Sequence, residues 1–437
     1  MDWYWVLVIV FSGLLLLMLT GMPIFVAFMF INVIGTFIYF GINGMEQLIL
    51  SMNSSLASFV LLPVPMFILM GEVLFRSGIA KNMLDVVDQW FGRLPGRLAL
   101  LAVASGTLLS TLTGTSSAST AMLGSLLTPE MEKRNYKKSL SIGSILGSGL
   151  LAVMIPPSSL AVLVGVIGEI SIGKILVAII IPGLLMAVMY AAYIIIRCIL
   201  QPSIAPVYDS TSRTPMGQRI KDTLRYALPL AVIIFLTIGV IIIGVATPTE
   251  AAALGTLGAF ILAAMYRKLS WTVMKESIFD TLKNSGMILI IVAASTAFTQ
   301  ILAFSGATQG LSSFIINVSA PPVIVIIGMI VVVLILGCFM SLMGIMMVTL
   351  PIFIPVVEAL KYDPVWFAVI FLIALELGLL TPPLGLNLYV MKGVTPPHFT
   401  MNDIIKAAVP FIAITCLVIL ILIVFPQATL WLPSLVK

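Results

Sequence analysis

Histidine, cysteine and charged residues are all scarce in this chain, and each shortage excludes a class of protein. His398 is the only histidine among 437 residues, which removes most zinc hydrolases and any Ser–His–Asp mechanism that needs a buried partner. Only 9% of the residues are charged, far fewer than the surface of a soluble domain requires. The three cysteines, Cys198, Cys338 and Cys416, are scattered through apolar segments and indicate neither a disulfide framework nor a metal site.

Long apolar segments take the place of the missing polar surface. Hydrophobic residues make up 61% of the chain, the mean hydropathy is +1.21, and apolar runs long enough to cross a bilayer recur along the whole length. The net charge is +5, but the basic residues lie in short loops between these runs, so no nucleic-acid partner is expected. The first ten residues, MDWYWVLVIV, lack a basic leader region and a cleavage site and predict a retained first helix.

The chain also repeats itself at an offset near 226 residues. Six pairs of positions match at offsets of 225 to 228: Pro23 with Pro248, Ser77 with Ser305, Pro129 with Pro355, Tyr136 with Tyr362, Pro156 with Pro382, and Pro182 with Pro410. Unrelated kinks in apolar helices are the alternative explanation. The repeat predicts two related units, 1–200 and 225–437, joined by the proline-rich and charged linker 201–224.

Each unit is predicted to cross the membrane five times and to contain one re-entrant hairpin. The hairpins are predicted at 46–79, with its tip near Ser58–Pro65, and at 286–314, with its tip near Ser295–Thr299. Residues 80–97 resemble a helix that lies in the interface. Because five is odd, the second unit would be inverted relative to the first. The predicted fold class is therefore an all-α polytopic membrane protein with two inverted repeats, about ten transmembrane helices and two re-entrant hairpins.

The distribution of lysine and arginine predicts the orientation. With the N-terminus outside, 15 of the 22 basic residues fall on the cytoplasmic side, and the opposite orientation reverses this bias. Both termini are then expected outside, with 213–221 in the cytoplasm.

The ion and substrate sites are expected where helices break at membrane depth. Unpaired backbone groups at such breaks must line a cavity or lie buried in protein. Freed carbonyl oxygens suit Na⁺, and helix N-termini favour an anion. One sodium site is predicted from 113–117 with the break at 155–159, and a second from 341–344 with 381–387. The sodium-binding candidates are Thr113, Gly114, Ser116, Ser117, Pro156, Ser341, Gly344, Thr381 and Asn387. The substrate-binding candidates are Ser58, Pro63, Ser119, Ser158, Ser295 and Thr299.

Each candidate also has a structural interpretation. A single Ser or Thr in a membrane helix commonly bonds to its own helix or packs helices together. Gly143, Gly147 and Gly149 are typical of close helix packing rather than of a phosphate site. Glu72 is four residues from Arg76 and is expected to pair with it. Glu250 and Glu376 lie in apolar runs, where a carboxylate is functional or paired, and Glu250 is also suited to cap a helix.

At these motifs the sequence resembles the large membrane (M) subunit of tripartite ATP-independent periplasmic (TRAP) transporters, of the DctM and SiaM type. The matching stretches are SFVLLPVPMFILMGEVLFRSGIA (58–80), TGTSSASTAMLGSLLTPEM (113–131), IPPSSLAVLVG (155–165), GVATPTEAAALG (244–255) and GLLTPPLGLNLYV (378–390). They match in order and span both halves, so the resemblance covers essentially the whole chain.

The resemblance implies a Na⁺-driven symporter of the bacterial inner membrane that imports a small organic anion, such as a C4-dicarboxylate or sialic acid. It implies an elevator movement, a small four-helix membrane (Q) subunit that is not fused to this chain, and a periplasmic substrate-binding (P) protein. Na⁺ is the expected coupling ion, and no other cofactor is expected. The mobile part is predicted to comprise 46–79, 98–168 and 286–392, and the scaffold 1–45, 174–268 and 404–437.

Three other functions compete with this hypothesis. A stand-alone Na⁺- or H⁺-coupled anion transporter of the same architecture would need no binding protein. A channel is also compatible with broken helices, although hairpins suit alternating access better. An intramembrane enzyme needs a catalytic constellation at depth, and the sequence offers no His or Cys pair and no Asp dyad for one.

Overall fold

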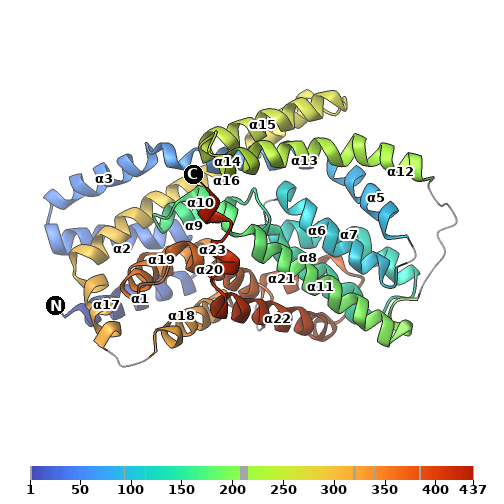
Figure 1. The fold of residues 1–437 in the computed structure, drawn as a ribbon. Helices are drawn as coiled ribbons and strands as arrows, with labels where there is room; N and C mark the ends of the chain where they lie inside the picture. The colour runs from blue at the N-terminus through green and yellow to red at the C-terminus, as the bar shows by residue number, and fades with distance from the viewer. Residues whose placement is uncertain are drawn as a thin grey trace.

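The computed structural model describes residues 2–92, 94–113, 115–206, 215–317, 321–338, 340–382 and 385–436, and every regular element in these ranges is a helix (Figure 1). The first half contains α1 (Trp3–Leu19), α2 (Ile24–Phe40), α3 (Asn43–Leu56), the short 3₁₀ turn η1 (Phe59–Leu61), α4 (Pro63–Arg76), α5 (Ile79–Phe91), α6 (Arg97–Thr113), α7 (Ser116–Lys133), α8 (Lys138–Met154), α9 (Ser159–Ile167), α10 (Ile172–Ala178) and α11 (Ile180–Leu200). A 3₁₀ turn, η2 (Pro202–Ile204), follows.

A helical segment runs from Met216 to Ile243, so it starts inside the predicted linker 201–224. It is made of α12 (Met216–Asp222), α13 (Leu228–Ile234) and α14 (Val240–Ile243), joined by the π-helical turns η3 (Thr223–Ala227) and η4 (Phe235–Gly239). The remaining elements are α15 (Pro248–Met265), α16 (Trp271–Phe304), α17 (Ala307–Asn317), α18 (Pro322–Gly337), α19 (Leu342–Ala359), α20 (Pro364–Gly378), α21 (Leu386–Val394), α22 (Met401–Val424), α23 (Gln427–Leu430) and η5 (Pro433–Leu435).

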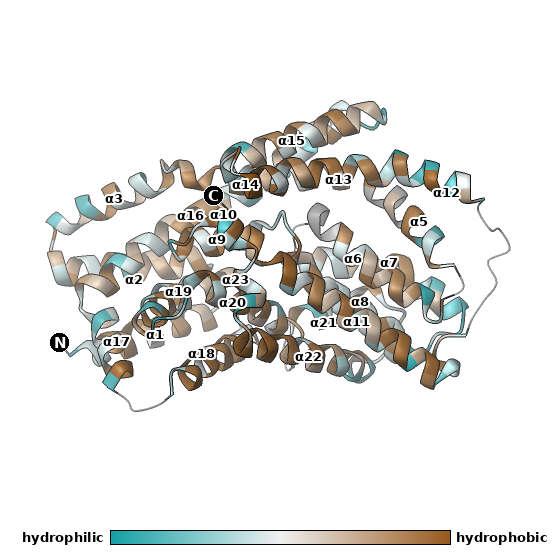
Figure 2. Ribbon diagram, in the orientation of Figure 1, coloured by the Kyte–Doolittle hydropathy of each residue, from teal (hydrophilic) through white to brown (hydrophobic). Residues whose placement is uncertain are grey.

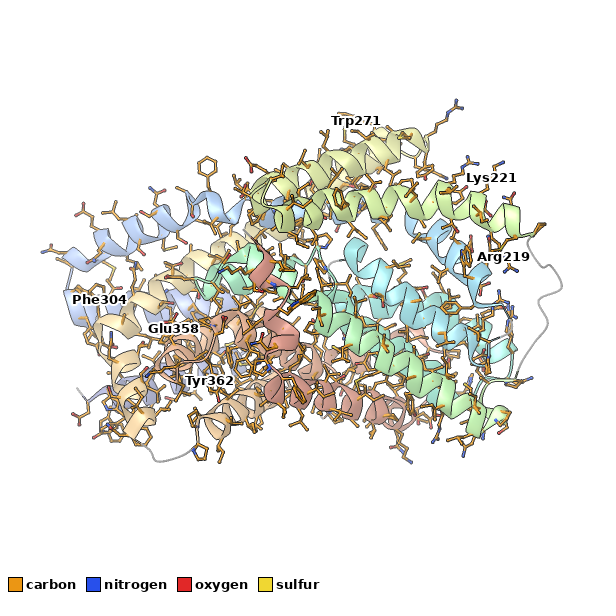
Figure 3. The ribbon with its side chains drawn as sticks, viewed as in Figure 1. Arg219, Lys221, Trp271, Phe304, Glu358 and Tyr362 are labelled. Atoms are coloured by element: carbon orange, nitrogen blue, oxygen red, sulfur yellow. The ribbon has the colours of Figure 1, made fainter. Side chains whose placement is uncertain are left out.

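Hydrophilic residues gather toward two opposite ends of the molecule, and apolar residues fill the region between them (Figure 2). Arg219 and Lys221 lie at one end, and Phe304, Glu358 and Tyr362 lie toward the other (Figure 3). Seven helices of the described residues are long and apolar enough to cross a membrane, and the bent pair α8–α9 would make an eighth. Five further apolar helices are shorter, so the expected count of ten crossings stays a prediction.

Helix starts in this chain are set by prolines and by capping side chains. Pro63, Pro248 and Pro364 each stand at the beginning of a helix, where a missing N–H costs nothing. At α15 the Thr247 hydroxyl accepts from the Glu250 N–H, and the Glu250 carboxylate accepts from the Thr247 N–H. The predicted capping role of Glu250 is therefore confirmed.

The breaks in the two halves keep the repeat offset. Helix α7 begins at Ser116 and α19 at Leu342, and α8 begins at Lys138 and α20 at Pro364; both pairs are separated by 226 positions. The helices of each half are thus cut at equivalent points, which the offset in the sequence predicts.

The hairpins, however, are not where the sequence analysis predicts them. The Leu98 N–H at the start of α6 donates to the hydroxyl of Tyr136, just beyond the end of α7, at 3.4 Å, so the two ends of the α6–α7 pair lie together. In the second half, Gly337 at the end of α18 lies against Gly378 at the end of α20, while α19 returns alongside α20 with Phe353 beside Phe367. The segments that turn back are therefore α6–α7 and α18–α19.

The two segments predicted as hairpins each run in one direction. Helix α16 is continuous over 34 residues, and at 1.5 Å per residue it extends about 51 Å, so no hairpin tip exists at 295–299. Helices α3 and α4 follow α16 in the antiparallel sense: Ser55 contacts Thr296, and Arg76 contacts Asp280. The hairpin prediction for 46–79 and 286–314 is therefore wrong.

Small residues let the helices around the breaks approach closely. A side chain at Gly143 or Gly147 would collide with Phe411 of α22, and one at Gly149 would meet the Thr120 hydroxyl of α7 at 2.3 Å. These glycines serve helix packing, as predicted. The amphipathic α5 packs on the start of the second half, where the Trp90 indole N–H donates to the Thr223 hydroxyl at 2.9 Å.

Candidate functional site

A cavity of about 480 Å³ lies where the breaks of both halves meet α4 and α16. Thr115 and Ala118 of the α7 N-terminus, Pro157 and Ser159 of the α9 N-terminus, and Met343 of the α19 N-terminus form one side. Three helices thus begin at this cavity. The positive ends of their dipoles lie at the same space, which favours a negatively charged ligand.

The opposite wall of the cavity carries an ionic cluster made by Glu72, Arg76 and Asp280, with Asn284 beside it. The Arg76 guanidinium donates to Glu72 at 3.2 Å on its own helix, which confirms the predicted pairing. It also donates to Asp280 and to Glu276 on α16. Arg76 therefore ties the first half to the second, and its side chain, 28% exposed, is only partly shielded from solvent.

Asn387 links the breaks of the two halves directly. Its amide nitrogen donates to the Ser116 hydroxyl at 3.1 Å, and its amide oxygen accepts from the Ser117 hydroxyl at 2.7 Å. Asn387 is fully buried at the start of α21, and Ser116 is the first residue of α7. The side chains predicted for two separate sodium sites therefore meet in one polar cluster that joins the halves.

The two breaks of the second half also lie side by side. The Cys338 thiol, just after α18, donates to the carbonyls of Thr381 and Pro382 at 3.6 and 3.4 Å. Gly337 and Gly378 are in contact at the same level. The predicted proximity of the 341–344 and 381–387 segments is consistent with this packing.

A second and larger cavity, of about 1410 Å³, lies further along the same helices. Pro63 of α4, Gly165 of α9 and Thr296 of α16 line it, whereas Phe67, Leu163 and Ile288 of the same three helices line the first cavity. Along α16 the second cavity is nearer Phe304 and the first is nearer Trp271. The two spaces are thus arranged in series along these helices.

The predicted sodium-binding residues divide into those that meet and those that do not. Ser116, Ser117 and Asn387 form the cluster described above. Thr381 donates its hydroxyl to the Leu377 carbonyl at 2.8 Å, so only its backbone oxygen faces the break. Ser341 is an exposed cap of α19 that accepts from the Gly344 N–H.

Three further candidates have backbone roles or lie partly outside the description. Pro156 is buried and precedes α9. Gly344 is packed close to Met18 and Ile24. Thr113 ends α6, and Gly114 lies outside the described residues.

The predicted substrate residues are dispersed. Ser58 and Pro63 line the second cavity rather than the first. Ser158 caps α9 by accepting from the Ala161 N–H, and its neighbours Pro157 and Ser159 line the first cavity in its place. Ser119 is buried and its hydroxyl has no partner among the described residues.

Ser295 and Thr299 do not line either cavity, contrary to their expected place at a hairpin tip. Both lie inside α16, where the Thr299 hydroxyl donates to the Ser295 carbonyl at 3.0 Å. The alternative interpretation, that such hydroxyls bond back to their own helix, holds for Thr299, whereas the buried Ser295 hydroxyl has no partner among the described residues.

Three residues that line the first cavity are not among the candidates from sequence. Thr115 lies within the TGTSSAS motif but does not stand out from its neighbours. Asp280 and Asn284 fall outside the predicted membrane segments. The sequence did carry a signal for these two residues, since Asp280 and Asn284 are four positions apart and directly precede a long apolar run.

The donor set of these breaks fits a hard monovalent cation better than a transition metal. Hydroxyl, amide and carbonyl oxygens dominate, and the described residues contain no group of three or more His, Cys, Asp or Glu side chains able to hold a metal. Oxygen ligands of this kind suit an alkali cation such as Na⁺.

Comparisons with known proteins agree with this architecture. Residues 11–428 match the family model of the tripartite ATP-independent periplasmic transporter, DctM component. The chain is 31% identical to the ectoine TRAP transporter large permease protein of Halomonas elongata, over 98% of this chain and 99% of that protein. It is 30% identical to the sialic acid TRAP transporter large permease protein of Vibrio cholerae, over 97% of each chain.

Among solved structures, the fold is similar to the YdaH transporter of Alcanivorax borkumensis. The TM-score is 0.62 with 15% sequence identity, covering 87% of this chain and 88% of that one. At this identity the likeness concerns the fold alone.

Proposed function

Since the chain belongs to the family of large (DctM) components of tripartite ATP-independent periplasmic transporters, we propose that it imports a small organic anion by sodium-coupled alternating access. It is a transporter subunit and not an enzyme, and it is a multi-pass protein of the inner membrane. The anion, the coupling ion and the movement are our proposals.

The convergence of three helix N-termini on the 480 Å³ cavity carries the anion assignment. Each N-terminus presents N–H groups and about half a positive charge. A carboxylate placed near Thr115 and Ser159 accepts from these donors without needing a basic side chain. Ectoine and sialic acid, which the names of two relatives specify as their substrates, both carry a carboxylate, and this supports a carboxylate as the ligand. A C4-dicarboxylate is a further candidate from the same family.

Alternating access is supported by the two cavities in series along α4, α9 and α16. Along α16 the first cavity lies nearer Trp271, an end flanked by the basic residues Lys268 and Lys275, and the second lies nearer Phe304. With basic residues in the cytoplasm, the first cavity faces the cell interior and the second faces the periplasm.

We propose that the two halves are inverted repeats and that the moving part is smaller than predicted from sequence. In each half, the segment predicted as a hairpin crosses the membrane and a segment predicted to cross turns back, so each half still has five crossings. Because five is odd, the second half is still expected to be inverted relative to the first. Helix α4 packs extensively on α15 and α16, which assigns α3, α4 and α16 to the scaffold. The elevator then comprises α6–α9 and α18–α21, the helices that carry the breaks.

Sodium ions are proposed at the breaks, where Ser116, Ser117 and Asn387 form one oxygen cluster and the 381–382 carbonyls form another. A small four-helix membrane subunit and a periplasmic binding protein are the proposed partners. The second candidate function is a stand-alone Na⁺- or H⁺-coupled anion transporter, with which the fold shared with the YdaH transporter is compatible.

Reconstitution tests the proposal. The chain is incorporated into liposomes with its small subunit, and carboxylate uptake is measured with and without a candidate binding protein under a Na⁺ or K⁺ gradient. Uptake that requires both Na⁺ and the binding protein is expected. Uptake without any binding protein favours the stand-alone transporter, and unchanged uptake when K⁺ replaces Na⁺ contradicts the sodium assignment.

A further inference from the structure

Glu376 is the only carboxylate among the fully buried residues of the described part of the chain. It lies on α20, two residues before the helix ends at Gly378, and only 1% of its surface is exposed. Neither of its carboxylate oxygens has a hydrogen-bond partner in the described structure. A carboxylate buried in this way is strongly destabilised unless a positive charge compensates it.

The surroundings of Glu376 supply oxygen atoms rather than a basic side chain. Ser116 is the polar side chain that influences the carboxyl group, and its hydroxyl also accepts the Asn387 amide N–H. Ser116, Ser119 and Thr120 lie on one face of α7 because they are three and four residues apart. The hydroxyls of Ser119 and Thr120 are fully buried and have no partner among the described residues.

A buried carboxylate beside the Ser116 side chain, without a lysine or arginine bonded to it, provides oxygen donors that suit an alkali-cation site. Hard cations prefer carboxylate, hydroxyl and amide oxygens. The carboxylate also gives the site a formal charge that cancels one monovalent cation, which carbonyl and hydroxyl ligands alone do not provide. Glutamate is not needed for packing here, since α20 is otherwise filled by apolar residues of similar size.

We propose that Glu376 binds one of the transported sodium ions, with Ser116 and the Asn387-bridged start of α7 completing the site. This inference rests on the sodium coupling proposed above and deepens it by naming the charged ligand. The site lies between α20 and α7, so it is assembled from both halves of the chain. When sodium leaves, the bare carboxylate remains in an apolar setting, which disfavours movement of the empty carrier.

The test compares Glu376→Gln with Glu358→Gln, a matched substitution on an exposed residue of α19. Each variant is purified with its small subunit, and its unfolding temperature is measured across a series of sodium concentrations with choline as the replacement cation. Sodium raises the unfolding temperature by binding the folded state. In Glu376→Gln we expect the half-saturating sodium concentration to rise by at least about tenfold, since a tenfold change needs only about 1.4 kcal/mol. Glu358→Gln is expected to behave as wild type.

A neutral structural role for Glu376 gives the opposite result. An amide reproduces the shape of a protonated carboxyl, so Glu376→Gln would then keep the full sodium response, and this outcome overturns the inference. If sodium fails to stabilise even the wild-type complex, the proposed sodium coupling itself is wrong. The two failures are therefore distinguishable.

Direct binding of radioactive sodium provides a second measurement. We expect Glu376→Gln to bind one sodium ion fewer per protein than wild type, and Glu376→Asp, which keeps the charge, to retain the ion with weaker affinity. If Glu376→Gln does not fold, the aspartate variant decides the matter: an unchanged sodium affinity there contradicts direct ligation, because a shorter side chain must displace the carboxylate from the ion.

Discussion

Replacing Gly337 by alanine should separate the two helices that carry the breaks of the second half. A Cβ atom at Gly337 would lie 2.7 Å from the Gly378 Cα and 3.2 Å from its carbonyl carbon. Ordinary carbon contacts are about 3.5–4.0 Å, so α18 and α20 must move apart by roughly 1 Å. The obstacle is backbone, which cannot rotate away as a flexible side chain can.

The expected cost follows from this geometry. Overpacking of one methyl group against a rigid neighbour costs about 1–3 kcal/mol, and the higher helix propensity of alanine returns up to about 1 kcal/mol. Gly328 lies on the same helix, and a Cβ atom added there would meet no neighbouring atom within 4 Å, so Gly328→Ala gains the propensity without the collision. The propensity term cancels between the two variants, and their difference of about 1–3 kcal/mol isolates the contact.

Thermal unfolding in detergent, followed by tryptophan fluorescence, measures this difference. Gly337→Ala should unfold at a lower temperature than wild type, and Gly328→Ala at the same or a higher temperature. The reciprocal variant Gly378→Ala should resemble Gly337→Ala, because its Cβ would lie 2.9 Å from the Gly337 Cα. Equal unfolding temperatures for Gly337→Ala and Gly328→Ala would refute the reasoning.

Three further predictions concern the links between the halves and the orientation. Asn387→Ala removes two hydrogen bonds and leaves the Ser117 hydroxyl without this acceptor. It should destabilise the protein by about 1–3 kcal/mol in thermal unfolding. An unchanged unfolding temperature contradicts the role of Asn387 in joining the two halves. Arg76→Ala should cost on the order of 1 kcal/mol, and the double variant with Asp280→Asn should cost less than the sum of the two, as a double-mutant cycle measures; strict additivity argues against the ion pair. A cysteine at Gly217 should react with membrane-impermeant reagents only from the cytoplasmic side, and labelling in intact cells would reverse the orientation.

The sequence predicts the positions of the breaks better than the direction of the chain through them. Adding the offset of 226 to the first residue of α7 gives the first residue of α19. The breaks repeat in this way because a proline or a glycine-hydroxyl cluster ends a helix wherever it lies. Hydropathy does not tell whether the next helix continues across or turns back. Helices α6 and α7 are similar in length, and only the contact between Leu98 and Tyr136 reveals the turn.

The site shows the same division between local and distant information. The pairing of Glu72 with Arg76 follows from their spacing on one helix, but the Asp280 partner is 204 residues away and no spacing predicts it. The break motifs single out Asn387, but its contacts with Ser116 and Ser117 cross between the halves, and the repeat alone suggests one site in each half. For Thr299, a hydroxyl bonded to its own helix is indistinguishable in sequence from a ligand.

The arrangement of the two cavities along α9 has an electrical consequence. Leu163 lines one cavity and Gly165 lines the other, and residues two apart point to opposite sides of a helix, so the body of α9, about 10 Å across, separates the two spaces at this point. Because water-filled spaces conduct, the membrane potential falls mainly across the thin wall between them rather than evenly over the bilayer. A charge that passes this wall therefore moves through almost the whole voltage, worth about 2.3 kcal/mol per elementary charge at 100 mV, within a very short distance. In the proposed sodium-coupled cycle, the step that carries the ion past α9 is where the energy of the membrane potential enters transport.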